Sequence, residues 1–523
     1  MMPEFDAVIR ELPALLQAHL LISGCAVLIA IAIGLPLAIW AADNARIRGP
    51  LLAVIGLFQT IPGLALLALF YPMLLLLDSV TPLAIPALGF APALLALSVY
   101  ALLPIVRNGV AAIRGIDPAL VEAANGLGMT RGQRLRLVEL PLGAPVILAG
   151  IRTATVWTIG TATLATTIGQ PSLGNLIFSG LQTEDWQRVL IGCAASACLA
   201  IIADGLLALV ESGLARRSAL RVRIGIGLIA AGLAVALTPM SGAAGGQRMV
   251  VIGAKNFSEQ YILAAALQSR LEAAGFRTER RDDLGSAIAY RALAAGDIDA
   301  YVDYSGTLWT NVLGRRDIPP APRMLAELTA TLARRDQVKL LGALGFENAY
   351  AFAMRRSRAE ALGIRSLDDL ATAAPRLRFA SDLEFLNRPE WKSVEDHYDL
   401  RFLEQRSYSP TFMYRAMAGG SADVLSAFSS DGRIASLDLV TLSDPRGALP
   451  SYQAVLLLSP RAARDRRLVA ALSPLVGAVS IERMRRANLM VDRDVDKKTP
   501  QEAARWLLPK AVEPQKQIAR KGQ

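Results

Sequence analysis

The stretch from Glu122 to Pro141, EAANGLGMTRGQRLRLVELP, is the longest polar interval in the first half of the chain. It carries three arginines and no lysine, and apolar stretches lie on both sides of it. Glycine adopts positive φ without steric cost, so Gly128 can end one short helix and let a second begin at an angle. The stretch therefore predicts a compact helix-turn-helix knob. An ordinary basic loop, held in the cytoplasm by its charge, is the alternative.

Six apolar stretches in the first half are long enough to cross the hydrocarbon core of a membrane, which takes about 20 residues each. They lie near residues 18–42, 52–77, 83–106, 144–168, 188–210 and 222–240. The chain of 523 residues is 53% hydrophobic and has a formal net charge of +10. Because its arginines cluster beside the apolar stretches, membrane topology explains this charge better than a nucleic-acid partner does.

Basic connections follow the first, third and fifth apolar stretches. They comprise Arg46, Arg48, residues 107–136 and residues 216–223. Since basic connections stay in the cytoplasm, the acidic amino terminus and everything after Met240 are expected outside. The stretch 222–240 is interpreted as an uncleaved anchor, although the small residues at 241–244 also resemble the end of an internal signal peptide.

Two ionisable residues lie inside the predicted spans, Arg152 near the start of the fourth and Asp204 near the end of the fifth. The topology places both at a similar cytoplasmic depth. Because an intramembrane ionisable residue usually faces the bundle and finds a partner, we predict that the two pair or share a polar network. The fourth span is also rich in threonine, whose hydroxyls hydrogen-bond either across a helix interface or back to their own helix.

The spacing around Glu122 resembles the cytoplasmic coupling loop of ABC importer permeases: EAA, three residues, Gly128, nine residues, Val138, one residue, then Leu-Pro. The phrases VELPLGAPVILAGIRTATVWTIGTATLATTIG and LGNLIFSGL are similar to the permease subunits of osmoprotectant importers, and the resemblance covers most of residues 18–212. It implies that an ATPase docks on this loop. The implied coupling residues are Glu122, Ala123, Ala124, Gly128, Leu140 and Pro141.

A phosphate-binding GxxxxGK[ST] motif is absent from the sequence, so the ATPase of such a machine is expected to be a separate subunit. A translocation path needs two permease halves, and this chain supplies one. The resemblance therefore implies a homodimer that works with two copies of the ATPase subunit.

After a Gly/Ala linker at 242–246 the composition becomes that of a soluble α/β protein. Residues 249–253 predict a buried strand, and Asn256 predicts a helix N-cap with the acid Glu259 at the third helical position. That helix is predicted to run to about residue 274 and a second helix from residue 286 to 295, and strands and helices then alternate. The pattern favours two α/β lobes with the ligand at the ends of strands.

Six phrases in this half resemble the osmoprotectant-binding proteins. They are VIGAKNFSEQYILA (251–264), GDIDAYVDYSGT (296–307), GFENAYAFAM (345–354), LEFLNR (383–388), FSSDGRI (428–434) and LPSYQAV (449–455). The resemblance spans about 250–460 and implies a site in which aromatic rings surround a quaternary ammonium while basic and hydroxyl groups hold a carboxylate. The implied aromatic box is Tyr304, Tyr350, Phe428 and Tyr452. The implied carboxylate clamp is Lys255, Thr307 and Arg388.

The chemistry of a trimethylammonium group agrees with such a box. The group has no N–H to donate, so ring faces are the partners that can recognise it, at about 2 kcal/mol for a desolvated contact. The two basic clamps favour a ligand with a carboxylate, such as glycine betaine, proline betaine, carnitine or ergothioneine, over choline. Phe428 stands where many relatives are expected to have tyrosine, which keeps the ring face and loses a hydroxyl.

Together these features predict an all-α transmembrane permease domain of about six helices, followed by a two-lobed α/β domain like the periplasmic binding proteins. The predicted divisions are 1–215 for the permease, 216–247 for the sixth span and linker, 248–509 for the binding domain and 510–523 for a disordered tail. The predicted function is that of an importer subunit for a betaine-type compound in the bacterial inner membrane, with the binding domain on the outer side. The alternatives are carnitine or ergothioneine uptake by the same architecture, or a membrane-anchored solute sensor.

An enzyme is the less favoured class. Asp297, Asp299 and Asp303 resemble a carboxylate cluster, but alternation along a strand sends neighbouring side chains to opposite faces, and structural roles are expected for them. The three cysteines lie within apolar stretches and the two histidines are far apart in sequence, so neither a metal site nor a cofactor is expected.

Overall fold

The computed structural model describes residues 3–80, 89–183, 185–238, 249–315, 317, 319–382, 385–408, 410–493 and 495–508. The chain divides into two compact units, one built almost entirely from residues before the predicted linker and one from residues after it. The first unit is helical and the second is α/β, so the predicted fold class is confirmed. The predicted linker at 242–246 and the predicted disordered tail lie outside the described residues.

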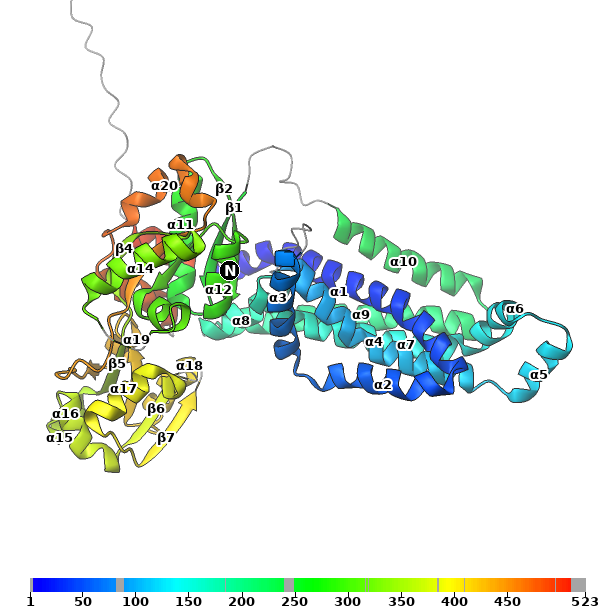
Figure 1. The fold of residues 1–523 in the computed structure, drawn as a ribbon, viewed down its shortest axis with the longest axis horizontal. Coiled ribbons are helices and arrows are strands. Elements are labelled where there is room, and N and C mark those ends of the chain that lie inside the picture. Colours follow the sequence, from blue (N-terminus) through cyan, green and yellow to red (C-terminus); the bar gives the residue numbers. More distant parts are fainter. Residues whose placement is uncertain are drawn as a thin grey trace, which may run out of the picture. The chain divides into compact units, whose positions relative to one another are not determined.

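The helical unit contains long helices that run side by side, with two short helices, α5 and α6, at one end (Figure 1). Its helices are α1 (Pro3–Asp43), α2 (Ala45–Thr60), α3 (Gly63–Val80), α4 (Phe90–Arg114), α5 (Pro118–Gly126), α6 (Arg131–Arg134), α7 (Leu140–Ala162), α8 (Gly174–Gln182), α9 (Trp186–Ala215) and α10 (Ala219–Leu237). A π-helical turn, Leu135–Glu139, joins α6 to α7, and a 3-10 turn, Thr163–Ile168, follows α7. Neighbouring contacts link α1 to α4, α4 to α7, α7 to α9, and α9 to α10.

Five helical segments in the described residues are long and apolar enough to cross a membrane. They are Val8–Asp43, Phe90–Arg114, Arg131–Ile168, Trp186–Ala215 and Ala219–Leu237. They correspond to the first, third, fourth, fifth and sixth predicted spans, although residues 83–88 and 239–240 of those predictions lie outside the described part of the chain.

The prediction of one continuous span over 52–77 is wrong, because α2 ends at Thr60 and α3 begins at Gly63. Pro62 lacks a backbone N–H, and its ring disfavours the helical conformation for the preceding residue. Ile61 accordingly has an extended backbone, with ψ of 126°. The prediction relied on hydropathy alone and did not take account of Pro62, which interrupts the helix.

The predicted partnership of Arg152 and Asp204 is confirmed between α7 and α9. The Arg152 Nε and Nη2 atoms donate to the two carboxylate oxygens of Asp204, at 2.9 and 2.8 Å. The Arg152 Nη1 atom donates to Glu211 at 2.7 Å, a partner that the sequence interpretation missed. Asp204 and Glu211 are seven residues apart and therefore share a face of α9.

Most threonines of the fourth span bond to their own helix, although the hydroxyls of Thr158 and Thr166 have no partner among the described residues. Five hydroxyls donate to backbone carbonyls three or four residues earlier, those of Thr153, Thr155, Thr161, Thr163 and Thr167. For these residues the second alternative, bonding within the helix, is the right one. Such bonds satisfy the hydroxyl locally and leave its helix surface for packing.

The α/β unit contains two five-stranded sheets, one in each lobe, with the orders β2-β1-β3-β10-β4 and β7-β6-β8-β5-β9. The strands of the first sheet are β1 (Met249–Lys255), β2 (Arg277–Leu284), β3 (Ala300–Tyr304), β4 (Lys339–Glu347) and β10 (Gln453–Leu458). The strands of the second are β5 (Tyr350–Arg355), β6 (Arg378–Asp382), β7 (Glu404–Tyr408), β8 (Val424–Phe428) and β9 (Leu439–Thr441). The chain passes between the lobes from β4 to β5 and again from β9 to β10.

Helices flank these sheets. They are α11 (Ser258–Ala273), α12 (Ser286–Ala295), α13 (Ser305–Thr307), α14 (Ala321–Asp336), α15 (Arg356–Leu362), α16 (Leu367–Ala373), α17 (Pro389–Tyr398), α18 (Pro410–Ala418), α19 (Arg433–Ser436), α20 (Arg466–Leu472), α21 (Ile481–Asp492) and α22 (Pro500–Leu507). The predicted helix 286–295 has the predicted ends. Gly275 and Gly296, which follow α11 and α12, both have φ of 83°, the left-handed conformation that glycine supplies at a helix end.

The predicted N-cap at Asn256 is wrong. Helix α11 begins at Ser258 with Phe257 in the N-cap position, and no side chain makes a capping hydrogen bond there. Glu259 is buried and bonds to side chains of other elements. The Glu259 carboxylate, which the local pattern assigned to capping the helix, therefore forms tertiary hydrogen bonds instead.

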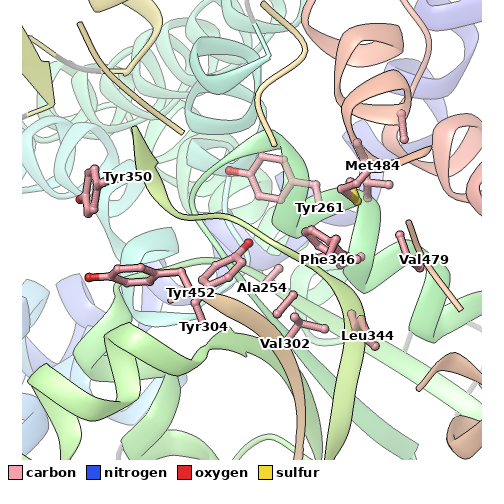
Figure 2. Packing of buried hydrophobic residues seen from close by; sticks show 14 of the residues in the cluster. Ala254, Tyr261, Val302, Tyr304, Leu344, Phe346, Tyr350, Tyr452, Val479 and Met484 are labelled. Carbon is pink, nitrogen blue, oxygen red and sulfur yellow. The ribbon is translucent and has the colours of Figure 1, made fainter. Parts of the chain in front are cut away.

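The strands of both sheets bring aromatic residues to the junction of the lobes. Antiparallel pairing of β5 with β8 sets Tyr350 opposite Phe428, and pairing of β10 with β3 sets Ala454 opposite Tyr304. Tyr304, Tyr350 and Tyr452 belong to the main buried cluster, together with residues such as Val302. Figure 2 shows these tyrosines among the buried side chains of that cluster.

Candidate ligand-binding site

A cavity of about 280 Å³ in the α/β unit is lined by residues from both lobes. All seven predicted binding residues line it: Lys255, Tyr304, Thr307, Tyr350, Arg388, Phe428 and Tyr452. Lys255, Tyr304 and Phe428 are the last residues of β1, β3 and β8, Tyr350 is the first of β5, and Tyr452 directly precedes β10. Open α/β sheets place ligands at such strand ends, which is how residues nearly 200 positions apart in sequence come together.

The Tyr350 ring contacts two other rings of the predicted box. The Tyr350 ring centroid lies 4.9 Å from that of Phe428 and 5.9 Å from that of Tyr452, the latter at an angle of 88°. The fourth, Tyr304, stacks on Phe257 with centroids 6.2 Å apart. Phe257 also lines the cavity and was missed, although it lies within one of the quoted phrases.

Tyr452 depends on Gly306 for its position. A Cβ atom on Gly306 would come within 2.6 Å of the Tyr452 ring, so a larger residue there would displace the ring. The Tyr452 hydroxyl donates to Glu390, and burial raises the pKa of Tyr452 above its ordinary value. The ring is therefore held by packing below it and by a carboxylate at its tip.

Each predicted basic clamp has a carboxylate partner. Lys255 forms an ion pair with Asp303, and the two side chains are 3% and 1% exposed. Arg388 donates to both carboxylate oxygens of Glu390, at 3.2 and 3.1 Å, and to the Tyr452 hydroxyl at 3.2 Å. Since each pair is nearly neutral overall, its attraction for a ligand carboxylate is weaker than that of an unpaired cation.

Glu259 is a cavity residue that the sequence analysis did not assign to the site. It is 3% exposed and accepts hydrogen bonds from the Tyr304 hydroxyl at 2.6 Å and from the side-chain amides of Asn348 and Asn488 at 3.0 and 2.7 Å. Burial raises the pKa of Glu259, and hydrogen bonds, including one from Ser430, act in the opposite direction. Asn488 comes from α21, far along the chain, and no phrase in the sequence pointed to it.

A second group of charges lines the cavity near α19 and α21. Arg433 donates to Asp431 at 2.7 Å, and its guanidinium lies 4.1 Å from the centre of the Tyr414 ring. Burial raises the pKa of Asp492 to about 6, while Arg433 acts to lower it. The carboxyl groups of Asp431 and Asp492 thus share this part of the wall with one guanidinium, that of Arg433.

In the helical unit, the predicted knob has the predicted shape. Helix α5 ends at Gly126, Gly128 has φ of 74°, and Thr130 caps the start of α6 through a capping box with Gln133. Buried Glu139 holds the knob together by accepting from Arg131 at 2.6 Å and from Arg134 at 2.8 Å.

The knob is also tied to the end of α1, because Arg131 forms an ion pair with Asp43 at 2.7 Å. Of the predicted coupling residues, Glu122, Ala123, Gly128 and Pro141 are exposed, Leu140 is half-buried and Ala124 is buried. Ala124 therefore packs within the knob, and the exposed members are those accessible to a partner.

Two family matches cover the two units. Residues 34–216 match the inner membrane component of binding-protein-dependent transport systems, and residues 248–510 match the substrate-binding domain of ABC-type glycine betaine transport systems. With the knob and the two-lobed cavity, these matches define the class of protein: a membrane permease of an ABC importer fused to a substrate-binding domain. Within this class, the chain belongs to the glycine betaine transport family. That membership implies a separate ATPase subunit and a small-molecule substrate.

Among curated proteins, the chain is similar to the ergothioneine transport permease/ergothioneine binding protein of Helicobacter pylori. The two are 28% identical over 495 residues, which cover 91% of this chain and 86% of the relative. The choline transport system permease protein of Bacillus subtilis is 40% identical over 193 residues, 37% of this chain and 83% of the relative. An osmoprotectant import permease protein of Salmonella typhimurium is 39% identical over 196 residues, 38% of this chain and 88% of the relative.

Proposed function

We propose that this importer selects a betaine-type quaternary ammonium compound in the cavity of its binding unit and passes it through the helical unit. One observation carries the proposal: the rings of Tyr304, Tyr350, Phe428 and Tyr452 all line a single cavity. A quaternary nitrogen has no N–H, so ring faces recognise it through cation–π attraction, at about 2 kcal/mol for each desolvated contact. Several such contacts supply a large part of the roughly 8 kcal/mol that micromolar binding requires.

Arg388 is the proposed anchor for a ligand carboxylate, with Thr307 and Lys255 beside it. The planar guanidinium of arginine suits bidentate bonding to a carboxylate. Its pairing with Glu390 reduces this attraction without removing it, and Lys255, paired with Asp303, contributes less than its charge alone suggests. Support for a quaternary substrate also comes from the relatives, which are named for ergothioneine, choline and osmoprotectant transport.

The proposed assembly is a homodimer in the bacterial inner membrane with two ATPase copies on the two knobs. The knob residues Glu122, Ala123, Gly128, Leu140 and Pro141 are the proposed contact, with Ala124 supporting them from inside. The proposed crossings after the knob are α7, α9 and α10, which are long and apolar enough to cross a membrane, and the proposal therefore has the binding unit on the side opposite the ATPase. The proposed domain divisions are 1–215 for the permease, 216–247 for the sixth span and linker, 248–509 for the binding domain and 510–523 for the tail.

Uptake of ergothioneine or carnitine fits the same architecture, and the H. pylori relative, which matches both units, supports the former. A membrane-anchored sensor is the alternative from another class. The formed knob, with its ion pairs from Arg131 and Arg134 to Glu139, favours import, because a sensor has no need of an ATPase dock.

Calorimetry on the full chain in lipid nanodiscs tests the proposal with glycine betaine, proline betaine, carnitine, choline and ergothioneine. Tyr350→Ala should weaken every quaternary ligand about 30-fold, the loss of about 2 kcal/mol of cation–π attraction. Tyr350→Phe is the matched control, because it keeps the ring face. Arg388→Gln should weaken the ligands with a carboxylate more than choline.

Binding of an uncharged or phosphorylated solute in place of all five compounds would overturn the proposal. Equal affinity of the wild type and of Tyr350→Ala for a bound quaternary amine would remove the aromatic box from it. Thermal unfolding of each variant without ligand shows whether a loss of binding arises from a loss of folding.

A further inference from the structure

One end of the cavity is formed by Glu259 with the side-chain amides of Asn348 and Asn488. These residues come from α11, from the crossing between β4 and β5, and from α21. The Nδ2 atoms of both asparagines donate to Glu259, one to each carboxylate oxygen. The Tyr304 hydroxyl donates to the same carboxylate. We refer to Glu259, Asn348 and Asn488 as the acceptor cluster.

The hydrogen bonds fix which way the two amides point. An ionised carboxylate only accepts hydrogen bonds, so each asparagine has to turn its amide nitrogen toward Glu259. The Oδ1 atoms of Asn348 and Asn488 are left without a hydrogen-bond partner among the residues that the structure describes. The two residues are 8% and 3% exposed, and a buried acceptor without a partner is unfavourable.

Glu259 also differs from three carboxylates that pair with basic residues of the cavity wall. Asp303, Glu390 and Asp431 are paired with Lys255, Arg388 and Arg433. In the described parts of the chain, Glu259 forms no ion pair with a lysine, arginine or histidine, and it accepts hydrogen bonds from the neutral side chains of Tyr304, Asn348 and Asn488. Buried charge without a countercharge is costly, so this end of the cavity favours a ligand group that is both a donor and electropositive.

The acceptor cluster has few donors left to offer a ligand. Each asparagine donates an amide hydrogen to Glu259, Asn488 also donates to the Ser430 carbonyl oxygen, and the Tyr304 hydroxyl donates to Glu259 as well. The atoms of the cluster without a partner among the described residues are the two amide oxygens, and both are acceptors. A methyl group of a quaternary nitrogen cannot satisfy them, because C–H groups are weak donors at best.

We propose, as an extension that rests on the proposed function, that the ligand carries an O–H or N–H donor in addition to its quaternary nitrogen, and that this donor binds the acceptor cluster. Glycine betaine and proline betaine have no such donor. A hydroxylated amine such as choline or carnitine has one, and so does a betaine with a ring N–H such as ergothioneine. The aromatic rings recognise the quaternary nitrogen, and the acceptor cluster selects among the compounds that carry one.

Pairs of ligands that differ only in the donor test this on the wild-type chain in nanodiscs. L-carnitine is compared with γ-butyrobetaine, which lacks its hydroxyl, and choline with propyltrimethylammonium. Ergothioneine is compared with the form that is methylated on both ring nitrogens, which has no ring N–H left. Glycine betaine and proline betaine complete the set. The tightest ligand should carry a donor, and its donor-free partner should bind at least about tenfold more weakly, since it leaves buried acceptors unpaired.

Variants of the two asparagines test whether the difference in affinity within a ligand pair arises at the acceptor cluster. Asn348→Ala and Asn488→Ala should each narrow the ratio of Kd values within the discriminated pair, because a donor-free ligand then leaves fewer unpaired oxygens. Gln268→Ala is the matched control: this amide is on α11 as well, but it bonds to Glu272 on the surface and should leave the ratio unchanged.

The wild-type measurement decides even if a variant fails to fold. Glycine betaine or proline betaine binding as tightly as the best donor-bearing compound would overturn this inference and leave the proposed function standing. If none of the quaternary compounds binds, the proposed function itself fails. An unchanged ratio in both folded asparagine variants would also overturn the assignment of the donor to this cluster.

Discussion

The two units of the chain place their charges in different surroundings. In the helical unit, Arg152 meets Asp204 and Glu211 with side chains that are 30%, 36% and 26% exposed. In the α/β unit, Lys255 and Asp303 are almost wholly enclosed. A charge inside an apolar span stands out in the sequence, so the pairing of Arg152 with Asp204 was predictable. Lys255 lies in a mixed sequence, where nothing local indicates that its partner is a buried aspartate.

The largest expected effect comes from breaking the enclosed pair. Lys255→Met should destabilise the binding unit by about 3–5 kcal/mol, because it leaves Asp303 charged and buried without a partner. The measurement is thermal or denaturant unfolding of the full chain, monitored by tryptophan fluorescence.

Lys392→Met provides a matched control for this effect. Lys392 pairs with Asp396 on the surface of α17, and the two side chains are 72% and 59% exposed. A pair of this kind contributes about 0–1 kcal/mol. Equal losses for Lys255→Met and Lys392→Met would contradict the distinction between the enclosed and the exposed pair.

A smaller effect is expected at the knob of the helical unit. Gly128→Ala forces a Cβ into the left-handed conformation at a cost of about 1–2 kcal/mol, although no atom lies within 4 Å of the added carbon. The strain should lower transport by reconstituted chain and ATPase and leave ligand affinity unchanged. Gly132→Ala, in α6 with open space around it, is the control and should support normal transport. A parallel loss of ligand affinity in Gly128→Ala would show that the two units do not act separately.

The smallest expected effect is a change in the pH dependence of stability. Burial raises the folded-state pKa of Asp492 from near 4 to about 6, so its carboxyl favours folding while it is protonated. This contribution is complete below about pH 4 and is lost as the pH rises through about 6. Asp492→Asn cannot ionise and should therefore gain stability relative to wild type between about pH 4.5 and 7.5, as measured by the thermal midpoint.

Asp496→Asn is the control for this pH series. Asp496 is exposed, and hydrogen bonding and charge attraction from Lys498 lower its pKa, the opposite direction from Asp492. Replacement of Asp496 by asparagine should not increase the thermal midpoint relative to wild type as the pH approaches neutral. A flat difference between wild type and Asp492→Asn across the series would contradict the assignment of the shift to burial.

Much of the local structure was predictable from the sequence. The turn at Gly128 and the ends of α12 follow from glycine and from the length of the helical pattern. The two failures have different causes. Pro62 interrupts the second apolar stretch, a local signal that hydropathy does not register, whereas the Glu259 carboxylate bonds with Asn348 and Asn488 from other elements instead of capping α11.

Local residue chemistry determined the turn at Gly128 and the ends of α12, most of the stretches that are apolar enough for a membrane, and the division of the chain into two differently built halves. The quoted phrases also identified aromatic and basic residues that line one cavity. Only the tertiary structure decided the partners of those residues: Lys255 with Asp303, Arg388 with Glu390, and Glu259 with amides from two other elements. Partner choice depends on burial and on distances between elements far apart in the chain, and a linear pattern contains neither quantity.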